Sequence, residues 1–290
     1  MGLRICCGGA ILRYIMMGPV LLTGGMGFVG RQVLRSLLGQ GEEVRLVVRK
    51  GNQEQLVPSQ LVGSTVATPD MFAEDSEWWS DVCCGIDTVI HCAWHVEHGN
   101  YLHSPKNLDC LIGTLCMAKG AANAGVRRFV GVGTCEEYDQ SGGLLSIDTP
   151  LRPHTVYGGS KAATFNILSH WFPARQVEFA WCRLFNLYGE GENSLRLVSY
   201  VRAKLIAGDI AELTGGYQIR DYLDVAIAGD MISEVACGSV QGAVNICSGV
   251  PVTVREFVER LAEIYGGHEL LKFGAQPDNP LEAPIVYGLA

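Results

Sequence analysis

The sequence predicts an α/β fold in which a doubly wound parallel sheet is followed by a small C-terminal α/β lobe. From Val20 onward, short runs rich in β-branched and aliphatic residues alternate with longer helical patterns, as in a parallel sheet whose strands are joined by helices. A glycine-rich turn lies between the first strand and the first helix. The composition, with 48% hydrophobic residues, 18% charged residues and 36 glycines in 290 residues, is typical of a globular protein.

The expected elements follow one another in a regular order. We expect strands of the main sheet at residues 20–22, 43–48, 66–68, 87–94, 127–134 and 177–189. The helices between them are expected at residues 31–41, around 78–79, at 108–124 and at 157–171. Beyond Gly189 the pattern changes to a helix at 195–208, short strand-like pieces within 210–225, a helix at 226–236, a strand at 243–249 and a helix capped by Thr253.

This order divides the chain into three parts. Residues 18–189 form the sheet domain, and residues 190–290 form mainly a lobe beside the carboxyl ends of the strands, with some segments returning to the sheet domain. Residues 1–17 contain a short apolar stretch that Arg13 interrupts, without a convincing signal-peptide cleavage pattern. We expect them to be a non-functional N-terminal extension.

Charge and cysteine usage limit the classes of partner. The net charge of −8 argues against a nucleic-acid or anionic-membrane partner, and no uninterrupted apolar run is long enough to cross a bilayer. The eleven cysteines are scattered and form no CxxC pair, which predicts a reduced cytoplasmic protein without zinc or disulfides. His95, His98 and His103 match no familiar metal-binding spacing, so we expect their loop to shape the fit of a substrate and predict no metal.

The turn "TGGMGFVG" places Gly24, Gly27 and Gly30 at the spacing G-x-x-G-x-x-G between a strand and a helix. Glycines at these positions allow a tight turn and let backbone N–H groups approach a pyrophosphate at the helix N-terminus. The turn therefore predicts dinucleotide binding, with Phe28 and Val29 of the same turn beside the cofactor.

The end of the second strand indicates which dinucleotide is bound. NAD-binding folds usually place an acidic residue there to hold the ribose 2′-hydroxyl, whereas this chain has Val48 followed by Arg49 and Lys50. Two cations and no acid suit a 2′-phosphate, so we predict NADP with Arg49 as its contact. NAD is the alternative if both cations are solvated surface groups.

The segment "TVYGGSK" places Tyr157 and Lys161 four residues apart at the start of a predicted helix. Residues four apart lie on the same helix face, so the phenol and the ammonium are expected to lie close together. A nearby Lys favours the phenolate and lowers the pKa of a Tyr, which makes the Tyr a candidate general acid or base. The alternative is an ordinary amphipathic helix.

Taken jointly, these motifs and "RLFNLYG" after the sixth strand resemble the extended short-chain dehydrogenases/reductases. More narrowly, "QIRDYLDV" and "VNICSG" followed by "TVREF" resemble the sugar-nucleotide epimerase/dehydratase/reductase group, and the resemblance covers residues 20–271. It implies a Rossmann domain, and implies that Tyr157 is the acid/base while Lys161 lowers its pKa and binds the nicotinamide ribose. Thr134 in "GTCEEY" would hydrogen-bond the reacting substrate oxygen.

The resemblance also implies contacts farther from the reacting atoms. Asp70, after the third strand, matches the position that contacts adenine, while Asn186 and Arg220 match positions that hold the sugar and the nucleotide diphosphate. The alternative for Arg220 is a salt bridge to Asp221 or Asp224. The family's 4,6-dehydratases follow the catalytic Thr with Asp-Glu, and this chain instead has Cys135 and Glu136, so dehydration is not expected.

We therefore predict an enzyme that uses NADPH to reduce a nucleotide-linked 4-keto-sugar. The alternatives are an NAD-dependent 4-epimerase and, from another class, a dinucleotide-sensing regulator without turnover, although such regulators tend to lose the Tyr/Lys pair. The chain ends short of the family's usual C-terminal segment, which predicts a reduced substrate lobe. The helices at 108–124 and 162–171 either pair across a homodimer, as the resemblance implies, or belong to the core.

Overall fold

The structure, a computed structural model, describes residues 18–51, 56–97, 99–280 and 282–289. The extension expected at residues 1–17 lies outside these ranges. None of the described helices is both long and apolar enough to cross a membrane.

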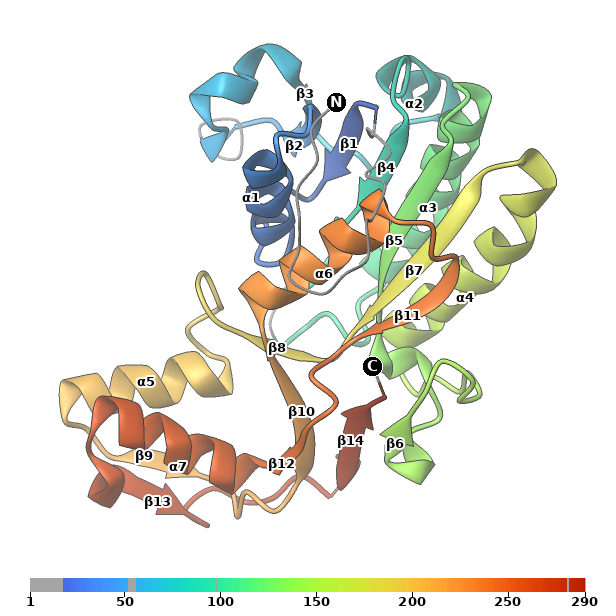
Figure 1. Cartoon of the computed structure of the whole chain (residues 1–290). Coiled ribbons are helices and arrows are strands. Elements are labelled where there is room, and N and C mark those ends of the chain that lie inside the picture. Colours follow the sequence, from blue (N-terminus) through green and yellow to red (C-terminus); the bar gives the residue numbers. More distant parts are fainter. Residues whose placement is uncertain (1–17, 52–55, 98, 281, 290) are drawn as a thin grey trace, which may run out of the picture.

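A seven-stranded sheet, parallel throughout, forms the larger unit, which confirms the predicted fold class (Figure 1). In spatial order its strands are β11 (Gly242–Ile246), β7 (Glu178–Leu184), β5 (Arg128–Thr134), β4 (Thr88–His91), β1 (Val20–Thr23), β2 (Val44–Arg49) and β3 (Thr65–Thr68). The strand order reverses at β1, because β2 and β3 extend the sheet on one side and β4, β5 and β7 extend it on the other. In open α/β sheets, ligands bind outside the carboxyl ends of the strands at such a point.

Helices cover both faces of this sheet. Figure 1 shows α1 (Gly30–Gln40) and α6 (Val225–Cys237) on one face, and α2 (Ser76–Val82), α3 (Lys106–Asn123) and α4 (Val156–Trp171) on the other. The central strands are aliphatic and fully buried because both of their faces are covered. The two helices of the first face approach closely at Gly229 of α6, where an added Cβ would lie only 2.6 Å from the Cβ of Gln32.

The smaller unit comes mainly from the C-terminal third of the chain. It contains a mixed sheet and a two-stranded sheet that packs with two helices (Figure 1). The mixed sheet has the order β12 (Pro251–Thr253), β10 (Ile219–Asp224), β14 (Ile285–Gly288) and β6 (Leu144–Leu145), with β8 (Asn186–Tyr188) also paired to β10. The remaining elements are β9 (Ala211–Leu213), β13 (Leu271–Phe273), α5 (Leu197–Ala207) and α7 (Val254–Tyr265), together with 3₁₀ turns at Ser59–Ser64, Cys135–Glu137, Gln140–Gly142, Pro173–Arg175 and His268–Leu270.

The local sequence accounts for the start of α7. The Thr253 hydroxyl accepts the N–H of Glu256 at 3.1 Å, and the Glu256 carboxylate accepts the N–H of Thr253 at 3.0 Å. This reciprocal pair satisfies two N–H groups that have no partner within the helix, as predicted for a helix capped by Thr253.

Two segments of the C-terminal third belong to the larger sheet unit. Helix α6 packs against α1, and β11 pairs with β7 as the edge strand. The strand expected at residues 177–189 is in fact divided, because β7 stays in the large sheet while β8 leaves it to pair with β10.

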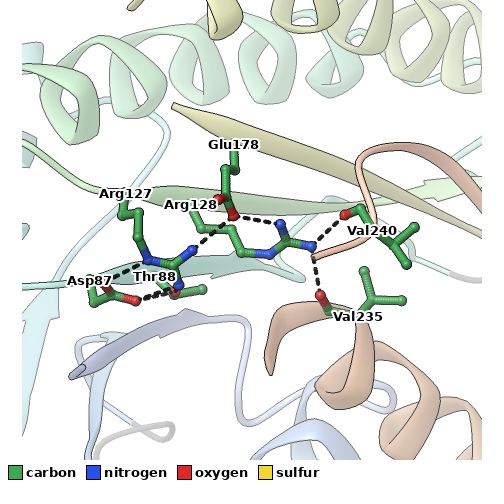
Figure 2. Close-up of polar contacts among 7 residues, drawn as sticks. All are labelled: Asp87, Thr88, Arg127, Arg128, Glu178, Val235 and Val240. Atoms are coloured by element: carbon green, nitrogen blue, oxygen red, sulfur yellow. Dashed lines mark hydrogen bonds and ion pairs between the residues drawn. The ribbon is translucent and has the colours of Figure 1, made fainter. Parts of the chain in front are cut away.

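A buried arginine joins these elements at the amino end of the sheet (Figure 2). Arg128, the first residue of β5, has no exposed surface. Its guanidinium pairs with Glu178 of β7 at 2.9 Å and donates to the carbonyls of Val235 at 2.7 Å and Val240 at 2.5 Å. The Val235 carbonyl lies in the last turn of α6, where helix carbonyls have no partner within the helix. Arg128 therefore caps α6 from a neighbouring strand.

The preceding residue makes a similar network at the surface (Figure 2). Arg127 has a side chain that is 43% exposed and pairs with Asp87 at 2.9 Å and with Glu178 at 2.8 Å. The adjacent arginines thus both pair with Glu178, although Arg127 is at the surface and Arg128 is buried.

Candidate active site

A cavity of about 640 Å³ opens at the carboxyl edge of the large sheet. The glycine turn after β1 lines one part of it, and β2 together with the segments after β3, β4, β5, β7 and β8 lines the rest. The cavity therefore lies at the reversal in strand order, where the fold places ligands. Of the predicted site residues, it is lined by Gly24, Gly27, Phe28, Val29, Gly30, Arg49, Thr134, Tyr157 and Asn186.

The glycine turn has the shape that a dinucleotide needs. Gly24 has a φ of +69°, and a Cβ there would lie 2.7 Å from the backbone nitrogen of Ala93. A Cβ on Gly30, the first residue of α1, would overlap the carbonyl oxygen of Gly24. The N–H of Gly27 closes the turn on that same carbonyl at 2.9 Å. Any side chain at Gly24 or Gly30 would distort the turn, and the turn leads into a helix N-terminus, so it fits a pyrophosphate.

The end of β2 carries a cation and no acid. Val48 is 4% exposed, so its side chain belongs to the core. Arg49 is the last residue of the strand and lines the cavity, whereas Lys50 does not. Asp70 accepts the N–H of Phe72 at 3.0 Å and is not part of the cavity lining, which Met71 and Phe72 supply instead. The contact between Asp70 and adenine stays a prediction.

Tyr157 lies in the first turn of α4, at the wall of the cavity. The helix begins there because the Thr155 hydroxyl accepts the N–H of Gly158 at 3.0 Å. The Tyr157 side chain is hydrogen-bonded to the Thr134 side chain, and the Tyr101 ring lies edge-on with a centroid distance of 4.9 Å. Burial raises the pKa of Tyr157, so its phenol is protonated.

Lys161 lies one turn further along α4, and its ammonium contacts Val132 and Trp94. It is 2% exposed, its Nζ donates to the carbonyl of Val132 at 2.5 Å, and the Nζ lies 3.8 Å from the centroid of the Trp94 ring. Burial lowers the pKa of Lys161 to about 8. The prediction that Lys161 lowers the pKa of Tyr157 is wrong in this structure, because burial dominates that pKa and the ammonium faces Val132 and Trp94.

Thr134 ends β5 and is held by a buried ion pair. Its N–H donates to the carboxylate of Glu137 at 2.8 Å. Arg183 donates to the same carboxylate at 2.8 Å and Trp181 at 3.0 Å, while Glu137 itself has no exposed surface. The Thr134 backbone is therefore held at the cavity by a carboxylate that is fully hydrogen-bonded.

Asn186 and Arg220 have different surroundings. Asn186 lines the cavity and donates to the carbonyl of Asp221 at 3.3 Å. Arg220 is 7% exposed, lies outside the cavity lining and forms its ion pair with Glu282. The alternative salt bridge to Asp221 or Asp224 is wrong, because Glu282 is the ion-pair partner. Binding of a diphosphate by Arg220 stays a prediction.

Several residues that line the cavity were not singled out from the sequence. They are Met71, Phe72, Trp94, Tyr101, Glu136, Asn193 and Arg196. Trp94 follows β4 closely, so the rule that ligands bind at carboxyl ends of strands gave a signal for it. Tyr101 lies in the loop between His95 and His103, which was expected to shape the fit of a substrate, whereas nothing in the sequence marked Arg196.

The histidine-rich loop shows no metal site in the part of the chain that is described. His95 lies 3.9 Å from Glu97, and among the described residues no three His, Cys, Asp or Glu side chains gather as metal ligands would. His98 lies outside the described residues.

Comparisons with known proteins agree with this geometry. Residues 20–244 match the model of the NAD dependent epimerase/dehydratase family. The chain is 24% identical over 277 residues to dTDP-6-deoxy-L-talose 4-dehydrogenase (NAD(+)) of Aggregatibacter actinomycetemcomitans, covering 93% of this chain and 98% of that one. It is 28% identical over 268 residues to dTDP-6-deoxy-L-talose 4-dehydrogenase (NAD(P)(+)) of Kitasatospora kifunensis, covering 85% and 79%. The crystal structure of dTDP-glucose 4,6-dehydratase from Streptomyces venezuelae, with NAD and TYD bound, superposes with a TM-score of 0.77 at 22% identity, covering 93% and 88%.

Proposed function

We propose, because this chain belongs to the NAD dependent epimerase/dehydratase family, that it is an oxidoreductase that reduces the 4-keto group of a nucleotide-linked sugar with NADPH. The observation that carries the proposal is the buried Tyr157 phenol, which meets the Thr134 hydroxyl at the wall of a cavity that also holds the glycine turn. Two similar proteins are named as 4-dehydrogenases of a dTDP-6-deoxy-sugar, which supports this reaction class.

The protonated Tyr157 phenol suits the proton-donating step of a reduction. A reductase must give a proton to the oxygen of the carbonyl, so it needs the phenol as a donor, whereas an alcohol oxidase step needs the phenolate as a base. Because burial raises the pKa of Tyr157, the phenol is the resting form. The Thr134 hydroxyl would donate to the same substrate oxygen, and the Glu137–Arg183 pair would hold the Thr134 backbone in place.

The glycine turn and Arg49 would hold the cofactor, whose nicotinamide supplies a hydride when bound. The chain itself would contribute the proton from Tyr157, so that hydride and proton together convert the carbonyl to an alcohol. We propose NADP rather than NAD because Arg49 lines the cavity at the end of β2 where an acid would otherwise bind the ribose 2′-hydroxyl.

Dehydration is disfavoured by Cys135. This residue stands where the family's dehydratases have an acid, and it is 7% exposed at the cavity. Burial raises the pKa of its thiol, so the side chain is a poor substitute for a carboxylic acid that must donate its proton.

The proposal is tested by supplying a nucleotide-linked 4-keto-6-deoxyhexose with NADPH or NADH, with the sugar in excess over enzyme. Consumption of one NADPH per sugar reduced supports the reductase, and a preference for NADH would refute the cofactor assignment. Interconversion of two sugar epimers without added cofactor would instead identify an epimerase. Cofactor binding without turnover on any such sugar would leave a dinucleotide-sensing protein.

We also propose that the chain forms a homodimer through α3 and α4. Large apolar side chains on these two packed helices are exposed, namely Leu108 at 52%, Ile112 at 60% and Ile167 at 45%. A second copy of the same face would bury them. Sedimentation of the wild type and of Ile112→Glu tests this, because the variant should be monomeric while the wild type is dimeric.

A further inference from the structure

Trp94 lies against the Lys161 ammonium at the wall of the cavity. Trp94 lines the cavity and Lys161 does not, although the two groups are in contact, with the Lys161 Nζ 3.8 Å from the centroid of the Trp94 ring. The chain leaves β4 at His91, three residues earlier, so the indole is carried by the segment that turns into the cavity.

The orientation of the indole is fixed from behind by a buried amide. Its Nε1–H donates to the Oδ1 of Asn107 at 2.8 Å. Asn107 has no exposed surface, and its Nδ2 donates to the carbonyls of Tyr101 at 2.6 Å and Ser104 at 3.0 Å. Because both amide hydrogens are committed to carbonyls, the amide oxygen must face the indole. The ring plane of Trp94 is therefore set by α3 and by the loop before it.

The indole face stabilises the charged form of Lys161, whose ammonium is shielded from water. Lys161 is 2% exposed, and its Nζ donates to the carbonyl of Val132 at 2.5 Å. An ammonium over the face of a Trp ring is attracted by the ring quadrupole, most strongly where water is excluded.

We propose that Trp94 is a positioning residue that holds the Lys161 ammonium charged and in one place beneath the cavity. The inference rests on the proposed function and on the role that the family resemblance implies for Lys161, which is to bind the nicotinamide ribose. The positioning role belongs to the Trp94 indole, which the Asn107 amide holds in place. Neither group makes or breaks a bond in the reaction.

Few other charges act on this ammonium. The titratable groups near it come from the segments around β4 and β5 and from α3 and α4, and they are Glu137, His91, Cys92, Cys110 and Tyr157. Burial lowers the pKa of His91 to about 3 and raises the pKa values of the cysteines and of Tyr157, so these four groups are neutral near pH 7. The Glu137 carboxylate is already paired with Arg183. The Trp94 face is the nearer of two indoles at this charge, because the Trp181 ring lies at 5.6 Å, and it acts together with the Val132 carbonyl and the Glu137 carboxylate.

The test measures the pKa of Lys161 directly in the ligand-free protein, by competitive acetylation as a function of pH with peptide mass spectrometry. Trp94→Leu removes the ring face, and we expect the Lys161 pKa to fall by about 0.5–1.5 units, with no change at the other lysines. Trp94→Phe keeps a ring but loses the bond to Asn107, so its shift should be smaller. Trp78→Leu, on α2 and away from Lys161, is the matched control and should leave the Lys161 pKa unchanged.

A second readout follows the affinity for NADPH and NADH against pH, measured by titration calorimetry. In Trp94→Leu the loss of affinity on the alkaline side should begin at a lower pH than in the wild type, by the same shift. An unchanged Lys161 pKa in Trp94→Leu would overturn the inference, whatever the affinity. A wild type that binds neither nucleotide would refute the proposed function, while the acetylation result would still decide the role of Trp94.

Discussion

Replacing Arg128 by Met should destabilise the protein far more than replacing its neighbour Arg127 by Met. The Arg128 side chain has no exposed surface and donates to Glu178 and to the carbonyls of Val235 and Val240. Removing it leaves two carbonyls without their donor, one of them in the last turn of α6, and leaves Glu178 with Arg127 alone. Glu178 is 35% exposed and keeps Arg127, so most of the cost comes from the two carbonyls, at about 1–3 kcal/mol for each buried acceptor left without its donor.

Arg127, which lies at the surface, gives the reference loss of stability with which the loss at Arg128 is compared. Arg127 has a side chain that is 43% exposed, so water replaces much of what its ion pairs with Asp87 and Glu178 provide. Its replacement by Met should cost less than about 1 kcal/mol. Both variants remove one positive charge next to the same carboxylate, so the difference between them isolates burial and the cap on α6.

Urea unfolding followed by fluorescence, with thermal unfolding as a second measurement, would give the two free energies. The Arg128→Met midpoint temperature should fall by roughly 5–15 °C. Arg128→Lys keeps the charge but cannot reach the carboxylate and both carbonyls, so it should lie between the wild type and Arg128→Met. If Arg128→Met and Arg127→Met differ by less than about 1 kcal/mol, the reasoning from burial and capping is refuted.

Four further predictions concern the site. Tyr157→Phe should lower turnover by about 100-fold or more while cofactor affinity stays within about twofold, as titration and steady-state kinetics would show. Gly30→Ala should weaken the cofactor by at least about tenfold, because its Cβ would overlap a carbonyl of the turn, whereas Gly39→Ala on the same helix meets open space and should leave affinity unchanged. Arg49→Asp should weaken NADPH much more than NADH in parallel titrations, and equal losses would count against a 2′-phosphate contact. Burial lowers the pKa of His91 from 6.5 to about 3, so below pH 6.5 the unfolded chain binds a proton at this residue before the folded protein does. The free energy of unfolding should therefore fall by up to about 1.4 kcal/mol per pH unit between pH 6.5 and pH 3. His91→Gln should remove this contribution of His91 to the pH dependence, as urea midpoints would show.

The parts of the fold that could be predicted are those that the local sequence specifies. The first strand, the glycine turn and the start of α4 follow from short motifs, and each lies where it was expected. The pairing of β8 with β10 could not be predicted, because nothing within residues 177–189 marks the point where the chain changes sheets. The pKa of Tyr157 was misjudged because spacing along a helix gives proximity but not burial or the direction of an ammonium.

The end of β4 shows, within the site, another feature that the sequence pattern did not predict. The sequence pattern extended this strand to Trp94, whereas the strand ends at His91. An indole at the end of a strand would lie on one face of the sheet, among helices. Because the chain departs from the sheet three residues earlier, the ring instead reaches the cavity and Lys161.

The return of α6 and β11 to the large sheet has a consequence for how the protein is made. A ribosome releases the chain from its N-terminus, so β1, α1 and β7 emerge long before the helix and the edge strand that cover them. Until then the apolar face of α1, with Val33 and Leu37, has no helix beside it, and β7 presents an open edge. The cofactor half of this protein therefore cannot be a finished folding unit when the ribosome reaches Gly189, and it is completed only after much of the smaller unit has been synthesised.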